Sequence, residues 1–193
     1  MTFRQLPSHD QILARVARYR SVRTQRPGRV DVPGVGQESV WDFPRPPAVE
    51  PVSQRLRVEW QGVTVADSGG GMRIIETAGA PVYYIPPADV RTDLLRETEH
   101  VTICEWKGAA VHYDLSQGQA VVRNAAFTYP DPLTDLGQGY EQVAGWYGFY
   151  PTKVDAVFVG EERARPQPGG YYAGWVTDAL TGPIKGEPGS EGW

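Results

Sequence analysis

The sequence predicts a mainly β fold, in which short antiparallel strands form a compact tent- or barrel-like domain with a few short helices. Glycine and proline together make up about a fifth of the chain, which indicates many turns. From residue 56 onward, apolar and polar residues alternate with period two, as in strands that bury one face. The 40% hydrophobic and 22% charged residues allow a packed core and exclude wholesale disorder.

Three segments of the chain differ in composition. Residues 1–54 form a basic, proline-rich arm, residues 55–160 form the predicted β domain, and residues 161–193 form an irregular tail rich in Gly, Pro and aromatic residues. The arm begins with a predicted helix, because Ser8 and Gln11 fit a capping box and an apolar stripe follows at helical spacing. Since an exposed aromatic tail would be costly, we expect the tail to wrap over the β domain.

The β domain contains a series of strand and turn signals. The clearest hairpins pair 73–77 with 82–86 across the four-residue loop 78–81, and 101–106 with 109–115 across Lys107 and Gly108. Further elements are expected as strands at 56–60, 63–65, 120–123 and 154–158, as one or two helical turns at 87–95, and as a short helix at 138–147.

Charge is distributed unevenly along the chain. Residues 1–57 hold ten arginines and five acidic residues, whereas the remainder holds nine basic and eighteen acidic residues. Opposite charges on two segments predict that the arm folds back on the acidic body or bridges to a second copy. The second possibility makes residues 41–47 (WDFPRPP) a docking arm for a homo-oligomer. An acidic body argues against nucleic acid as a partner.

The cellular compartment and the absence of disulfides are predicted from features that the sequence lacks. No apolar run is long enough to span a bilayer, and the N-terminus lacks the apolar region of a signal peptide, so we expect a cytoplasmic protein without a membrane partner. Cys104 is the single cysteine, which excludes an intrachain disulfide and a cysteine-rich zinc site.

Cys104 has two interpretations, as a nucleophile or as a small core residue. Lys107 lies three residues further on and could activate the thiol. With a two-residue turn at Lys107 and Gly108, Cys104 opposes Val111 in an apolar set, which favours the core interpretation. With a three-residue loop and a bulge, Cys104 opposes His112 instead.

A metal site has little support in the sequence. His100 and His112 could join Asp89, Glu97 and Glu99, but neither HxH nor HExxH spacing is present. We therefore predict no metal and no other cofactor.

Aromatic and polar residues on neighbouring strands instead predict a concave site. Tyr83 and Tyr84 point to opposite faces of one strand, so one of them can line the interior. Such a pocket would suit a small planar or anionic ligand, although the same rings could simply fill the core. The candidate catalytic residues are Cys104, Glu76 and Lys107, and the candidate ligand-binding residues are Arg73, Tyr83, Trp106, Tyr113, Asn124 and Tyr129.

Four sequence blocks resemble one bacterial family. They are VYYIPPADVRTDLL (82–95), CEWKGAAVHYDL (104–115), RNAAFTYPDPL (123–133) and GFYPTKVDAV (148–157). In this order they resemble the domain-of-unknown-function family 427, which some collections label as nucleotidyltransferase-like, over about residues 55–160. The arm and tail resemble extensions carried by a branch of that family. The resemblance implies a compact antiparallel β domain related in shape to small zinc-binding β folds, without their paired cysteines, and no established reaction.

The chain contains none of the sequence motifs that nucleotidyl transfer commonly uses. Ser68 and the three glycines after it are not followed by DxD, and no P-loop or GxGxxG element is present. The sequence thus favours an uncharacterised small-molecule-binding β domain. The alternatives are an enzyme that uses Cys104 or Glu76 with Lys107 for nucleotidyl or other group transfer, and an assembly module that docks through residues 41–47.

Overall fold

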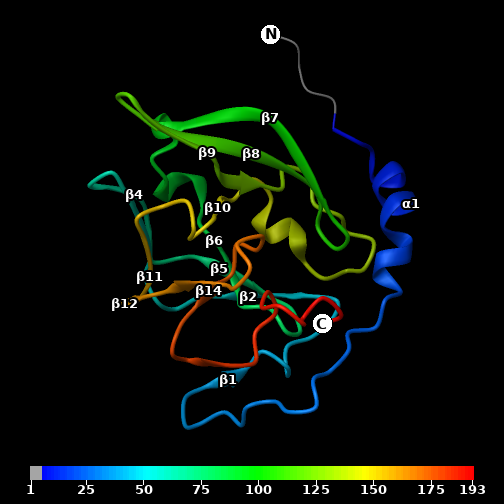
Figure 1. Cartoon of the computed structure of the whole chain (residues 1–193). Helices are drawn as coiled ribbons and strands as arrows, with labels where there is room; N and C mark the ends of the chain where they lie inside the picture. Colours follow the sequence, from blue (N-terminus) through cyan, green and yellow to red (C-terminus); the bar gives the residue numbers. More distant parts are fainter. Residues whose placement is uncertain (1–5) are drawn as a thin grey trace.

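The computed structural model of the protein describes residues 6–193, so Arg4 of the arm lies outside the described residues. The fold is mainly β, as predicted, and the larger sheets are antiparallel (Figure 1). Among the described residues the sheets remain open and do not close into a barrel. The larger sheets have the orders β10-β9-β8-β7, β12-β11-β3-β4 and β2-β5-β6, and two-stranded pairs join β1 to β15 and β13 to β14.

Every strand expected between residues 56 and 158 is present, most with shifted ends, and β1, β2, β10 and β12–β15 are strands that the sequence analysis did not identify. The strands are β1 (Glu38–Ser39), β2 (Ala48–Pro51), β3 (Leu56–Trp60), β4 (Val63–Ser68), β5 (Met72–Ile75), β6 (Val82–Tyr84), β7 (Leu95–Cys104), β8 (Gly108–Gln117), β9 (Ala120–Thr128), β10 (Gly148–Phe149), β11 (Ala156–Val159), β12 (Glu162–Arg163), β13 (Arg165–Pro166), β14 (Trp175–Val176) and β15 (Leu180–Thr181). The helices are α1 (His9–Arg20) and the short 3₁₀ turns η1 (Pro87–Asp89), η2 (Thr92–Leu94) and η3 (Tyr140–Val143). The helix expected at 138–147 is thus reduced to η3.

The turn between β7 and β8 corrects both registers considered from the sequence. Cys104 pairs with Gly108 and Val101 pairs with Val111, so the turn consists of residues 105–107. Gly108 has φ +95°, a conformation that favours glycine, and the turn therefore ends there rather than being centred on it. This shift decides which side chains of the hairpin share a face.

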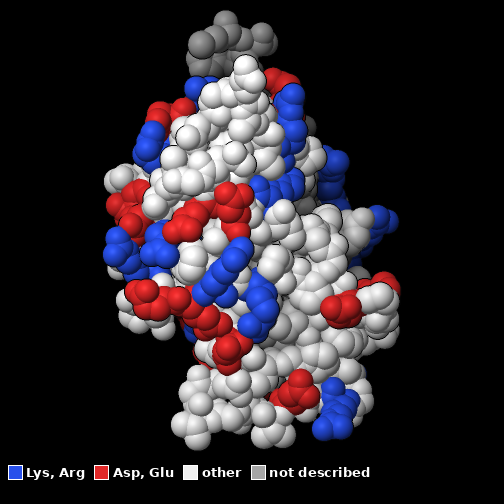
Figure 2. Space-filling view, turned by 60° about the vertical axis from the view of Figure 1, so that its left-hand side comes forward, with Lys and Arg blue, Asp and Glu red and all other residues white. Residues whose placement is uncertain are grey.

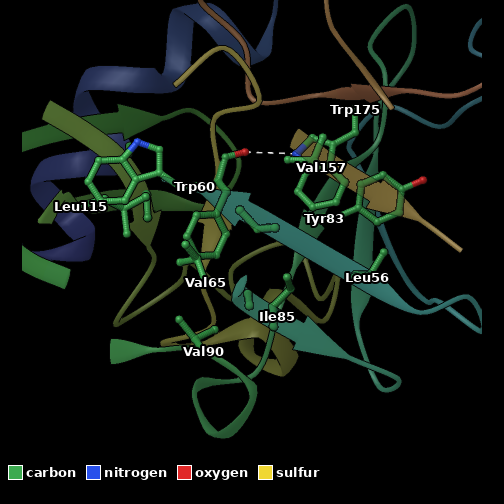
Figure 3. Packing of buried hydrophobic residues seen from close by; sticks show 14 of the residues in the cluster. Leu56, Trp60, Val65, Tyr83, Ile85, Val90, Leu115, Val157 and Trp175 are labelled. Atoms are coloured by element: carbon green, nitrogen blue, oxygen red, sulfur yellow. Dashed lines mark hydrogen bonds between the residues drawn. The ribbon is translucent and has the colours of Figure 1, made fainter. Parts of the chain in front are cut away.

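The main core lies between the sheets and includes the C-terminal tail (Figure 3). Leu56 and Val58 of β3 are fully buried in it, as the period-two pattern predicts. In β11 the pattern indicated Ala156 and Phe158 as the core face, but Val157 is the fully buried residue, so this strand presents the opposite face to the core. Tyr83 also belongs to this core, because its ring packs on Trp175 with centroids 5.0 Å apart. Tyr84, one residue on, points to the opposite face and joins a second apolar cluster.

The N-terminal arm docks on its own chain. The capping box of Ser8 and Gln11 begins α1, and Ile12 and Val16 pack against Leu133 and Ala109 of the domain. Arg20 at the end of α1 pairs with Asp135, and its Nε also donates to the Glu105 carbonyl oxygen at 2.5 Å.

The proline-rich part of the arm is buried as well. Trp41 packs edge-on against Trp193, with centroids 5.4 Å apart, and Phe43 joins the same cluster. Both anchor residues of the 41–47 segment thus have a binding surface within their own chain. Docking of this segment on a second copy stays a prediction.

The tail from residue 161 onward crosses the domain and returns to the arm. Trp175 is fully buried, and β15 lies parallel to β1 of the arm, with Glu38 opposite Leu180 (Figure 1). On the face in Figure 2, acidic and basic side chains are interleaved rather than segregated. No helix of the described residues is long and apolar enough to cross a membrane.

Candidate functional site

A cavity of about 1030 Å³ lies between the β7–β9 sheet, the β5–β6 hairpin, helix α1 and the C-terminal tail. Its size is that of a small-molecule site. The domain contributes apolar and aromatic walls, among them Ile74, Phe127 and Tyr150. Arm and tail complete the rim with Arg18 and Tyr171.

Lys107 lies on the wall of this cavity and is only 8% exposed. The turn holds its backbone in place, because its carbonyl oxygen accepts a hydrogen bond from Leu133 N at 3.1 Å. Its ammonium lies 5.4 Å from the centroid of the Tyr129 ring, and no hydrogen bond or ion pair joins it to another described residue. Burial lowers the pKa of Lys107, whereas Coulombic attraction to Cys104, Tyr129, Tyr84 and Glu76 in their ionised forms raises it. The attraction is the larger effect, so this pKa lies well above its usual value. The cavity therefore contains a buried positive charge.

Two buried tyrosines stand beside Lys107. Tyr84 is fully buried, and its hydroxyl has no hydrogen-bond partner among the described residues. Burial raises the pKa of Tyr84 and that of Tyr129 above the usual value, so both phenols stay protonated at neutral pH. This part of the cavity presents hydrogen-bond donors around one cation, an arrangement that suits an anionic oxygen.

Glu76 is held in a polar cluster at the edge of the cavity. Its carboxylate pairs with Arg45 and accepts a hydrogen bond from the Trp106 indole nitrogen at 3.0 Å. Arg45 also lies 3.6 Å from Glu105 and covers the Trp106 ring, with Cζ 5.1 Å from the centroid. Arg45 and Trp106 thus both contact the same carboxylate oxygen of Glu76, Oε1.

Cys104 on β7 and Asn124 on β9 line the cavity from the two strands that flank β8. Cys104 is half-buried, and its Sγ lies 4.0 Å from a carboxylate oxygen of Glu105. Asn124 has φ +50°, and its backbone N–H donates to Asp114 at 2.8 Å, while its side-chain oxygen accepts from Thr98 at 2.9 Å. The Asp114 bond fixes the kinked strand so that Asn124 faces the cavity.

The cavity brings together five of the nine predicted site residues and not the other four. Glu76, Cys104, Lys107, Asn124 and Tyr129 line it. Tyr83 and Tyr113 instead pack on Trp175 and Tyr147, with centroids 5.0 and 5.4 Å apart. Arg73 pairs with Glu38 and Glu50. Trp106 donates its indole N–H to Glu76 and does not itself line the cavity. We therefore correct the expectation that these four share the cavity.

Several cavity residues were missed by the sequence reasoning. Strand alternation predicts that one of the adjacent residues Tyr83 and Tyr84 faces the interior, but it does not tell which one, and Tyr84 was not chosen. Tyr150, Lys153 and Lys185 gave no signal, because their contribution depends on where loops far apart in sequence meet.

His100 and His112 also line the cavity. The rings of His100 and His112 are 4.6 Å apart, and His112 Nε2 lies 2.9 Å from the Thr102 hydroxyl. Within residues 6–193, no group of three His, Cys, Asp or Glu side chains has the arrangement of a metal site.

The buried tyrosines predict a steep loss of stability in alkali. Burial raises the pKa of Tyr83 and of Tyr150 from 10.0 to about 12. Because an unfolded tyrosine ionises near its usual pKa, the stability that these groups contribute is complete below pH 10 and is lost as the pH rises through about 12. Phenolate absorbance followed together with circular dichroism checks this prediction. Ionisation of all ten tyrosines near pH 10 in a still-folded protein would contradict it.

A comparison with protein families identifies the domain that carries most of this cavity. A family model named NTP_transf_9 and described as "Domain of unknown function (DUF427)" matches residues 48–160, more than half of the chain. No curated protein matches the chain. Helix α1 and the tail lie outside the matched residues.

Proposed function

Because the chain belongs to the DUF427 family, whose description names no activity, we propose from the cavity itself that the protein binds a small organic anion with a planar, aromatic part. The observation that carries this proposal is Lys107, a buried ammonium on the cavity wall without an ion-pair partner among the described residues. The surrounding groups keep this ammonium protonated, and a bound anion would supply the direct ion pair that no described residue provides.

The charge around the cavity supports the same class of ligand. Six basic side chains line it, from Arg15, Arg18, Arg45, Lys107, Lys153 and Lys185, against the two acids Glu76 and Glu105. Both acids already face Arg45. The cavity therefore has an excess of positive charge that attracts anions.

The aromatic walls support a planar part of the ligand. Phe127 packs against Tyr150 with centroids 5.3 Å apart, and Tyr84 meets Phe127 edge-on at 6.0 Å. These rings present flat surfaces next to the buried donors. A ligand with an aromatic ring and a carboxylate or phosphate group would use both features. Group transfer through Glu76 is less well supported, since Arg45 and Trp106 engage its carboxylate.

Titration calorimetry with benzoate tests the proposal. We expect Lys107→Met to weaken benzoate binding by about tenfold or more, because a hydrogen bond to a charged group contributes roughly 1.5–3 kcal/mol. The matched control is Arg91→Met, which removes the same charge at an exposed pair with Asp93 away from the cavity. It should bind benzoate like the wild type.

Two results would contradict the proposal. One is equal benzoate affinity in the wild type and Lys107→Met. The other is a wild-type protein that binds neither benzoate nor inorganic phosphate and carries no co-purifying organic anion in native mass spectrometry.

A further inference from the structure

The exposed residues that line the cavity, which we call its mouth, come mainly from segments outside the family domain. Arg15, Arg18 and Tyr19 come from α1, and Tyr171 comes from the tail, whereas the family match spans residues 48–160. The buried donors belong to the matched domain. The two extensions therefore supply most of the mouth.

Two of these mouth residues are exposed aromatic side chains. Tyr171 is 77% exposed and Tyr19 is 48% exposed, although both line the cavity. Large exposed rings are informative when they gather at one place, because they leave apolar surface in contact with water. Here they gather at the entrance to a cavity whose inner walls are also aromatic.

The backbone that carries Tyr171 is anchored on both sides. Gln167 and Ala173 are buried, and Gly169 lies so close to Gly186 that an added Cβ would stand 2.6 Å from its carbonyl oxygen. Only the short exposed stretch with Gly170 and Tyr171 projects between these anchors. The backbone position of Tyr171 is thus set by packing on both sides.

Neighbouring groups orient the two rings. Tyr171 meets Tyr172 edge-on at 5.1 Å, and its hydroxyl is close enough to Tyr150 to contribute, after burial, to the raised pKa of that residue. On the other side, the Arg18 guanidinium donates to the Tyr19 hydroxyl at 2.5 Å. Tyr171 therefore lies near Tyr150, another ring that lines the cavity.

We propose that Tyr171 selects the ligand by stacking on its planar part at the mouth of the cavity, while Lys107 holds the anionic group inside. This inference rests on the proposed function and adds the residue that sets specificity. A stacked aromatic pair has a favourable geometry that a saturated ring of the same size lacks. The protein should therefore prefer flat anions over puckered ones of equal charge.

The test compares benzoate with cyclohexanecarboxylate, which has the same charge and a similar size but no flat ring. We expect the wild type to bind benzoate about three- to tenfold more tightly. Tyr171→Ser should reduce this preference by weakening benzoate alone, and Tyr171→Phe should keep it. Because Tyr171 is so exposed, all three proteins should have the same thermal midpoint.

The outcomes separate the two proposals. Loss of both anions in Lys107→Met, together with an unchanged benzoate preference in Tyr171→Ser, would overturn the role of Tyr171 and leave the anion site standing. An equal loss of both anions in Tyr171→Ser would also overturn it, because stacking affects only the flat ligand. If the wild type binds neither anion, the proposed function fails first.

Discussion

Replacing Trp175 with alanine should lower the free energy of unfolding by about 3–5 kcal/mol, as large-to-small changes at buried tryptophans do. Trp175 is fully buried, its ring packs on Tyr83, and its indole nitrogen donates to the Phe149 carbonyl oxygen at 3.1 Å (Figure 3). The substitution would leave a large cavity between the tail and the domain and an unsatisfied carbonyl group. Denaturant unfolding followed by circular dichroism measures the loss.

Trp175→Phe is the matched variant for this prediction. It keeps most of the ring packing and removes the hydrogen bond, so it should cost about 1–2 kcal/mol. A loss below about 1 kcal/mol in Trp175→Ala would show that the tail is only an accessory segment. The predicted result would show that the domain matched by the family and its C-terminal extension share one core.

Replacing Gly186 with alanine should destabilise the tail by about 2–5 kcal/mol, since backbone strain and overpacking add. Gly186 has φ +126°, and an added Cβ would stand 2.0 Å from the Pro168 carbonyl oxygen. The backbone of residues 168–172 would have to move to relieve this contact. Because Tyr171 lies on this stretch, the preference for benzoate over cyclohexanecarboxylate should fall as well.

Gly189 provides the control for this substitution. It also has a positive φ of +91°, but an added Cβ would meet nothing within 4 Å. Gly189→Ala should therefore cost only the backbone strain, about 1 kcal/mol, and leave the ligand preference unchanged. Equal effects of the two substitutions would show that the contact between Gly186 and Pro168 does not hold the tail.

The prediction of the fold succeeded where the signals were local. The capping box at Ser8 and Gln11 and the apolar stripe of Ile12 and Val16 predicted α1, and the structure has the helix at His9–Arg20. Alternation likewise located β3, whose Leu56 and Val58 are buried as expected. Such signals depend on residues a few positions apart, which the sequence shows directly.

The prediction of the β7–β8 turn failed because its determinants are distant. The glycine at 108 suggested a turn centred there, but Trp106 is held in the turn by Glu76 and by the guanidinium of Arg45. These partners come from the 76–81 loop and from the arm. The register of the hairpin therefore follows contacts that local turn preferences cannot contain.

The candidate site divides in the same way. Five of the predicted residues reached the cavity because they occur on the adjoining strands and loops of one domain. Tyr83 did not, because Trp175 from the tail covers the face of β6 on which it lies. Sequence patterns could not identify Tyr171 and Lys185 as cavity residues, because the tail that carries them reaches the cavity only after crossing the domain.

The sequence by itself determined a mainly β domain with a capped helix before it and an aromatic tail behind it, because periodicity, capping and turn residues act over short distances. It also contained the resemblance that the family match confirms. Only the tertiary structure decided that Tyr84 rather than Tyr83 faces the cavity, and that α1 and the tail supply most of its mouth. The physical reason is that burial and ion pairing depend on which distant segments pack together, and for this chain those segments come from both ends.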